Sequence, residues 1–338
     1  MKKKACILSI LLLATLFGTA GAKEINVLFM GNSFTFRHDL PELVKIIFEE
    51  GQTNLTVNVE QIVYGGQDLF RHYNLFFSQS MVRLNSIKVP EIEDFMIRID
   101  AYLDMQEAPN FYTAYCEQIG LAPEPWSKIT SNLEAARHMQ RQLIERIRNN
   151  KRVKWDYLVL QSWRDVVADG GAGYAAYVEQ WAKIAEKEGI KLILYITAPH
   201  AHNPTPVDAP RNAEQTAMEM QTIRELTKRV KPHAVVPVAL GIQAIQEGGT
   251  DLTFCYVNDW HPNQYCAFLT ANMFYAAFFN ESTEGFAFNT VVENKDKGAG
   301  EGKDPDGGDA KVVLDDETKE LLQRVAYESV VQFNSAVK

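Results

Sequence analysis

The chain has 338 residues, a hydrophobic fraction of 46% and a formal net charge of −9. This length and apolar content suit one large α/β domain, with or without an insertion. An acidic chain is a poor candidate for nucleic-acid binding, because that function needs a basic surface. We therefore expect a protein with its own core, acting on a small-molecule or polymer substrate rather than on DNA or RNA.

The first 22 residues are predicted to be a cleavable secretory signal peptide. Lys2 to Lys4 form a charged start, residues 5–20 are apolar, and Ala20-Gly21-Ala22 is a small-residue cleavage site. The apolar run is short for a membrane span, and the rival reading is an uncleaved membrane anchor. No later stretch approaches transmembrane length. Residues 23–338 are thus expected to be secreted or periplasmic, without stable membrane insertion.

The cysteines exclude a disulfide framework. Cys6 would leave with the signal, and Cys116, Cys255 and Cys266 remain without a Cys-x-x-Cys pair. One disulfide is allowed at most, so stability must come from a hydrophobic core.

Apolar strands alternate with amphipathic helices along the chain. The first strand is predicted at residues 25–30, and it is followed by Gly31, Ser33 and a helix that starts near Leu40. Further strands are predicted at residues 55–64, 155–160, 191–197 and 234–240. Near-continuous apolar strands separated by helices predict a parallel sheet that is covered on both faces.

Two stretches depart from this alternation. Residues 74–131 are rich in aromatics and interrupted by prolines, which predicts a mostly helical insertion after the second strand, serving as a lid or as a platform for a sugar ring. Residues 295–308 are rich in Gly, Asp and Lys, and they predict a mobile surface loop. A closing helix is expected at residues 314–333.

Chemically useful residues stand at the predicted strand ends. Ser33 follows the first strand, Gly65 and Gly66 the second, and Gln161 the third, while His261 comes later in the chain. Ligands of an open α/β sheet gather at the carboxyl ends of its strands. The set therefore offers a nucleophile, close backbone donors, an amide and a base. The rival readings are that Ser33 only caps a helix and that Gly65-Gly66 is an ordinary turn.

These residues resemble the motifs of the SGNH/GDSL hydrolase superfamily, the flavodoxin-like serine esterases and lipases. Gly31-Asn32-Ser33-Phe34 is similar to the first block, Gly65 or Gly66 to the second, and His261-Pro262 to the last. The resemblance spans residues 25–279 apart from the insertion. It implies a three-layer α/β/α flavodoxin-like fold with a parallel sheet of about five strands.

The resemblance also implies roles for single residues. Ser33 would attack an ester carbonyl and His261 would be the base. The oxyanion would be held by the N–H of Ser33, a glycine N–H and a side-chain amide. The family's asparagine is absent at the third strand, so Gln161 is predicted to supply that amide.

The residue that orients the base is left open by the spacing. The family has an aspartate three residues before the histidine, where this chain has Asn258, while Asp259 stands two residues before His261. Asp259 is favoured on charge, because a carboxylate stabilises an imidazolium better than an amide does. Arg164 and His200 are predicted to contact substrate.

We therefore predict an exported serine esterase that needs no cofactor and no metal, and that acts on short-acyl esters of acetyl type on carbohydrate. One alternative is a non-catalytic carbohydrate-binding relative of the fold. A second alternative is a metal-dependent hydrolase that uses His200 and His202, since alternating histidines can share one ion.

Overall fold

The computed structural model describes residues 23–120, 122–163, 165–167, 171, 173–197, 209–259 and 261–337. The predicted signal peptide, Arg164, His200 and His202 lie outside the described residues. Within the described part, no helix is both long and apolar enough to cross a membrane.

A five-stranded parallel sheet forms the centre of the molecule. The strands are β1 (Lys23–Gly31), β2 (Leu55–Val63), β3 (Tyr157–Gln161), β4 (Lys191–Ile196) and β5 (Ala234–Pro237), in the order β2-β1-β3-β4-β5. This is the flavodoxin-like order, whose switch point lies between β1 and β3. The predicted fold class is confirmed. The fifth strand is shorter than predicted, because the chain becomes helical at Val238.

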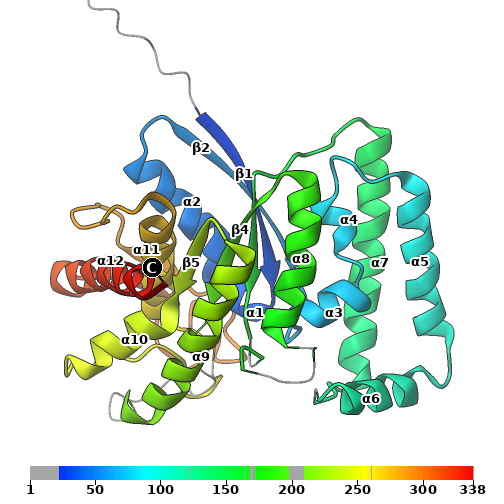
Figure 1. Cartoon of the computed structure of the whole chain (residues 1–338). Helices are drawn as coiled ribbons and strands as arrows, with labels where there is room; N and C mark the ends of the chain where they lie inside the picture. The colour runs from blue at the N-terminus through cyan, green and yellow to red at the C-terminus, as the bar shows by residue number, and fades with distance from the viewer. Residues whose placement is uncertain are drawn as a thin grey trace, which may run out of the picture.

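Helices cover both faces of this sheet (Figure 1). On one side lie α2 (Leu40–Gly51), α11 (Gln264–Phe279) and α12 (Asp316–Val337), and on the other lie α3 (Leu69–Asn74), α7 (Trp126–Arg148) and α8 (Tyr174–Glu188). Two further helices, α9 (Ala209–Val230) and α10 (Val238–Glu247), flank β5 in the chain. Helix α11 is buried almost all round, which explains why its sequence lacks a polar stripe.

The predicted insertion consists of helices packed beside the sheet. They are α4 (Gln79–Val82), α5 (Val89–Asp104), α6 (Ala108–Gln118) and the first part of α7. Figure 1 shows α5 and α7 side by side, with α6 near the end of the sheet at which α1 (Ser33–Phe36) lies. Helix α7 begins at Trp126, directly after Pro125, which is its N-cap residue.

The C-terminal part contains a hairpin that the pattern did not reveal. Strands β6 (Thr290–Val292) and β7 (Lys311–Val313) pair antiparallel and flank the segment predicted to be a mobile loop. That segment is built from hydrogen-bonded turns, in which the Asp304 carboxylate accepts the N–H groups of Asp306 and Gly308 at 3.0 and 2.8 Å. Its mobility stays a prediction.

The cysteines form no disulfide among the described residues. Cys116, Cys255 and Cys266 are all buried thiols. Burial raises the pKa of the Cys255 and Cys266 thiols to about 12, so both stay protonated and unreactive. The single disulfide that the count allowed is therefore not present.

Candidate active site

Ser33 is presented by a tight turn at the carboxyl end of β1. The N-cap of α1 is Asn32, whose side chain accepts the Phe34 N–H at 3.1 Å, so Ser33 is the first helical residue and not the cap. Gly31 precedes the turn, where an added Cβ would lie 2.2 Å from Gln161 Oε1. No described residue accepts the Ser33 N–H. The turn thus leaves both the hydroxyl and the N–H of Ser33 available to a ligand.

His261 is brought to Ser33 by a loop between α10 and α11. Its Nε2 lies 2.8 Å from Ser33 Oγ, although the two residues are 228 positions apart. An isolated antiparallel β-bridge pairs Cys255 with Pro262 and closes the loop. Within it, the Tyr256 N–H donates to His261 O at 2.9 Å. We call residues 255–262 the base loop. Its hairpin shape holds the imidazole against the turn at residues 31–34, which we call the nucleophile turn.

Asp259, and not Asn258, lies beside the imidazole. The Asp259 Oδ2 atom is 3.1 Å from His261 Nδ1, and the Asp259 backbone oxygen is 3.0 Å from the same nitrogen. Asn258 is exposed, and its N–H donates to Asp306 Oδ1 at 2.8 Å. A proton on Nδ1 is shared between Asp259 Oδ2 and the Asp259 backbone oxygen. Nε2 is then left unprotonated, and it can accept the Ser33 hydroxyl proton.

The charges around this pair favour an ionised carboxylate and a neutral imidazole. Burial raises the pKa of Asp259, but its hydrogen bond to Arg37 and the charges of His261, Arg37 and Lys297 outweigh burial and hold that pKa below its usual value. Burial lowers the pKa of His261. The charge of Asp259 raises this pKa and the charges of Arg37 and Lys297 lower it, so that the His261 pKa lies below its usual value. The imidazole is therefore mostly unprotonated near neutral pH, as a base must be.

The glycine turn after β2 lies next to the nucleophile turn. Gly31 pairs with Val63, and Asn32 Nδ2 donates to Gln67 O at 3.0 Å, which ties the two turns together. Gly66 has φ +68°, and a Cβ there would lie 2.2 Å from Lys128 Nζ. The N–H groups of Gly65 and Gly66 donate to no described residue. Within the described residues these two N–H groups therefore remain without an acceptor.

Gln161 does not have the free amide that the sequence predicts. Its Nε2 donates to Asn32 Oδ1 at 2.8 Å and to Ser162 O at 3.0 Å, so both amide hydrogens are used. Its Oε1 accepts from Asn32 N at 3.0 Å and from Thr35 Oγ1 at 2.5 Å. In this geometry Gln161 braces Asn32, and its predicted oxyanion role stays a prediction.

Three charged residues of the site escaped the sequence analysis. They are Arg37, Glu293 and Lys297, and each is linked to Asp259 directly or through a neighbour. Arg37 stands four residues after Ser33 in an otherwise aromatic stretch, which is the one local signal that could have marked it. Glu293 and Lys297 carry no such signal, because they lie beyond residue 279, where the resemblance to the family motifs ends.

The predicted substrate contacts Arg164 and His200, and the alternative metal ligand His202, lie outside the described residues. Among the residues that the structure does describe, no group of three His, Cys, Asp or Glu side chains could hold a metal ion.

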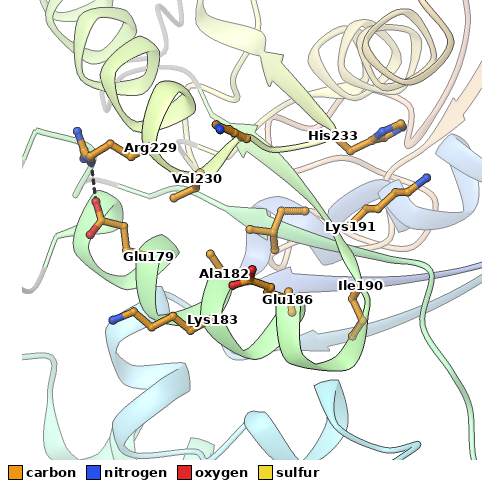
Figure 2. A pocket seen from close by; sticks show the side chains of 12 residues that line it. Glu179, Ala182, Lys183, Glu186, Ile190, Lys191, Arg229, Val230 and His233 are labelled. Carbon is orange, nitrogen blue, oxygen red and sulfur yellow. Dashed lines mark hydrogen bonds and ion pairs between the residues drawn. The ribbon is translucent and has the colours of Figure 1, made fainter.

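A separate hollow of about 780 Å³ lies at the other end of the sheet (Figure 2). It is lined by the C-terminal half of α8, by Lys191 at the start of β4 and by His233 just before β5. Those strand starts are opposite to the edge that carries Ser33. Figure 2 shows the ion pair between Arg229 and Glu179 at its rim, with an N–O distance of 2.7 Å. The hollow therefore does not belong to the candidate active site.

Comparisons with known proteins find similar architecture at low identity. No family model matches the chain, and no curated protein matches it. The crystal structure of a DUF4886 family protein from Bacteroides uniformis is similar over 91% of this chain and 95% of its own, with 14% identity and a TM-score of 0.48. A Slackia heliotrinireducens protein, described provisionally as an SGNH hydrolase, is similar over 76% of this chain and 100% of its own, with 14% identity and a TM-score of 0.41.

Proposed function

We propose that this chain is a serine hydrolase of SGNH type that cleaves short-acyl esters. The observation that carries the proposal is the unbroken line of contacts from Ser33 Oγ through the two imidazole nitrogens of His261 to Asp259 Oδ2, at 2.8 and 3.1 Å. A nucleophile, a base and an orienting carboxylate in hydrogen-bond reach of one another form the arrangement that activates a serine.

The acylation step follows from these contacts. His261 Nε2 takes the hydroxyl proton as Ser33 Oγ attacks the ester carbonyl carbon, and Asp259 stabilises the resulting imidazolium. The tetrahedral intermediate then collapses: the ester C–O bond breaks, and the proton on Nε2 goes to the leaving alcohol. Water, activated by the same nitrogen, hydrolyses the acyl-enzyme and releases the acid.

The oxyanion is assigned to backbone donors. The N–H groups of Ser33, Gly65 and Gly66 are without a described acceptor and lie on two adjacent turns. Each such donor typically contributes about 10²- to 10³-fold to turnover. The side-chain donor that the sequence assigned to Gln161 is left out of this mechanism.

A small acyl group and a carbohydrate alcohol are the finer part of the proposal. Phe34 packs edge-on against the His261 ring with centroids 5.6 Å apart, which restricts space beside the base. A hollow of about 380 Å³ in the insertion is lined by Tyr102, Phe111, Tyr115 and Trp126, with Asn74 as a polar group. Aromatic faces with a nearby amide suit a sugar ring.

Ester hydrolysis is tested with 4-nitrophenyl acetate, butyrate and octanoate, and with an acetylated oligosaccharide. We expect the acetyl ester to be the best of the chromogenic series, and deacetylation of the oligosaccharide with unchanged rate in a chelator. Inhibition by the chelator would favour the metal-dependent alternative. Sugar binding without any hydrolysis would favour the non-catalytic alternative.

A further inference from the structure

A buried ion cluster lies directly behind Asp259. Arg37 is 1% exposed; its Nη1 donates to Asp259 Oδ2 at 2.5 Å, while Nε and Nη2 donate to the two carboxylate oxygens of Glu293 at 2.8 and 2.5 Å. The Glu293 side chain is fully buried. A planar guanidinium held by such a two-pronged contact has one direction left for its third nitrogen. That direction points to Asp259.

Arg37 also touches the nucleophile through its main chain. Its backbone N–H donates to Ser33 O at the end of α1. Contacts therefore run from Ser33 to His261, on to Asp259, then to Arg37 and back to Ser33. Each of the four residues is held by two others, so the site closes on itself although its parts come from distant segments.

Asp259 has a competing cation at its other oxygen. Lys297 Nζ lies 3.4 Å from Asp259 Oδ1, and the Lys297 side chain is 52% exposed. An exposed lysine on a flexible stem orients a carboxylate poorly, because its single ammonium fixes no plane. Arg37 is the partner that fixes which way the carboxylate faces.

The surroundings of Arg37 favour its fixed position. The Tyr256 ring of the base loop lies 5.5 Å from Arg37 Cζ, and His38 Nε2 contacts Pro262 O at 2.7 Å and Glu293 Oε2 at 3.4 Å. Burial lowers the pKa of His38, so it is neutral here. One buried guanidinium and the Lys297 ammonium thus face the carboxylates of Glu293 and Asp259.

We propose that Arg37, held in place by Glu293, is a positioning residue that fixes the Asp259 carboxylate against His261 Nδ1. This rests on the proposed function, in which His261 is the base. The groups that face His261 are Asp259, Arg37, Lys297 and the Ser33 hydroxyl. Asp259 raises the pKa of His261 more than Arg37 lowers it. If loss of Arg37 releases the Asp259 carboxylate from Nδ1, the His261 pKa therefore falls, whereas loss of the Arg37 charge alone, with the carboxylate still in place, raises it.

The test uses the double variant Arg37→Gln/Glu293→Gln, in which two amides replace the buried ion pair and can hydrogen-bond each other. The matched control is Arg146→Gln/Glu60→Gln, since Arg146 on α7 also makes a two-pronged contact, from Nη1 and Nη2 to Glu60 on β2 at 2.7 and 2.9 Å. The His261 pKa is measured by NMR in the full-length mature chain, with His261→Ala identifying the signal.

We expect the His261 pKa to fall in Arg37→Gln/Glu293→Gln, because the Asp259 carboxylate leaves Nδ1, and to stay unchanged in the control. The rate of Ser33 acylation should fall about 10²-fold, as when a catalytic group is displaced by about 1 Å. If the double variant unfolds, Arg37→Lys keeps the charge without the fork, and it should lose rate with little change of the His261 pKa.

A raised or unchanged His261 pKa together with an unchanged acylation rate in the folded double variant, or full rate in Arg37→Lys, overturns the positioning role. Failure of the proposed function looks different, because wild-type Ser33 would then show no acylation at all. The NMR titration needs no turnover, so it reports on Arg37 in either case.

Discussion

Two buried arginines flank the candidate site, and they are built into it differently. Arg37 joins segments far apart in the chain, Ser33 and Asp259 to Glu293. Arg71 is equally buried but joins segments that are closer together in the chain. It pairs with Asp68, the N-cap residue of α3, at 2.5 Å, and it donates to Tyr112 and Ala122 of the insertion at 2.8 and 2.9 Å. The base side of the site is therefore secured by the C-terminal segment, and the glycine turn by the insertion.

The charge balance differs in the same way. On the base side, Asp259 and Glu293 face Arg37 and Lys297. On the glycine-turn side, the guanidinium of Arg71 faces two buried carboxyl groups, those of Asp68 and Asp165, and its charge lowers the pKa of each. Burial first, and then the charge of Asp68, raise the pKa of Asp165 to about 7. Asp259 on the base side thus stays ionised, while Asp165 on the glycine-turn side takes up a proton near neutral pH.

The largest effect is expected at Asp259. Asp259→Asn should reduce kcat by about 10³- to 10⁴-fold, since an amide favours the wrong imidazole tautomer and does not stabilise the cation. Asn258→Ala is the matched control, because its side chain is exposed and it should keep kcat within about twofold. Both variants are compared on 4-nitrophenyl acetate. Equal rates in Asp259→Asn and wild type would mean that His261 works without a carboxylate.

Arg71→Met should act on stability rather than on chemistry. Removing one partner of a buried ion pair costs about 3–5 kcal/mol, because Asp68 is left buried without a counter-ion. Urea unfolding measures the loss, and Arg71→Met/Asp68→Asn should recover part of it. At a temperature where the variant is folded, its His261 pKa should match wild type, unlike that of the Arg37→Gln/Glu293→Gln variant. A shifted His261 pKa would remove the distinction between the two arginines.

Gln161→Ala should lower stability more than its position at a strand end suggests. The substitution removes the bonds that brace Asn32, and leaving buried partners without hydrogen bonds costs about 1–3 kcal/mol. Turnover should fall with the loss of a rigid nucleophile turn. Gln161→Glu keeps the stem and the acceptor atoms but loses the donor, so it serves as the control. Full stability of Gln161→Ala would contradict the bracing role.

Asp165→Asn is expected to have the smallest effect on activity, and its effect on stability depends on pH. Asp165 binds a proton more tightly in the folded chain than in the unfolded chain, so it costs stability as pH rises from about 4 to about 7. An asparagine avoids that cost and still accepts the Trp163 N–H. Thermal unfolding should show a higher Tm for Asp165→Asn at pH 8 and little difference at pH 4. The same difference at both pH values would exclude the titration.

Local patterns predict the scaffold and the proximity of Ser33 to His261 well. The run from Ile25 to Met30 is apolar except for Asn26 because β1 is covered on both faces, and the composition of the run reports that directly. Ser33 and His261 are recognisable because each stands in a short motif beside such an element. The choice between Asn258 and Asp259 was made on charge, and the structure brings Asp259 to the imidazole.

Other features of the site depend on directions and distances that no local pattern contains. The sequence places Gln161 at a strand end, but the side chain turns toward Asn32 and not toward a ligand. The pair Arg37–Glu293 spans 256 positions, so neither residue marks the other. Strands β6 and β7 are only three residues long and contain one buried residue, Val291, which leaves too few buried positions to show a period.

The central claim, that Ser33 is a nucleophile activated by His261, is tested most directly by covalent labelling. Wild type, Ser33→Ala and His261→Ala are treated with a fluorophosphonate, and intact-protein mass spectrometry is followed by peptide mapping. We predict one adduct on Ser33 in wild type, none in Ser33→Ala, and labelling slowed by at least about 10³-fold in His261→Ala. Equal labelling of wild type and Ser33→Ala, or none in either, would contradict the account.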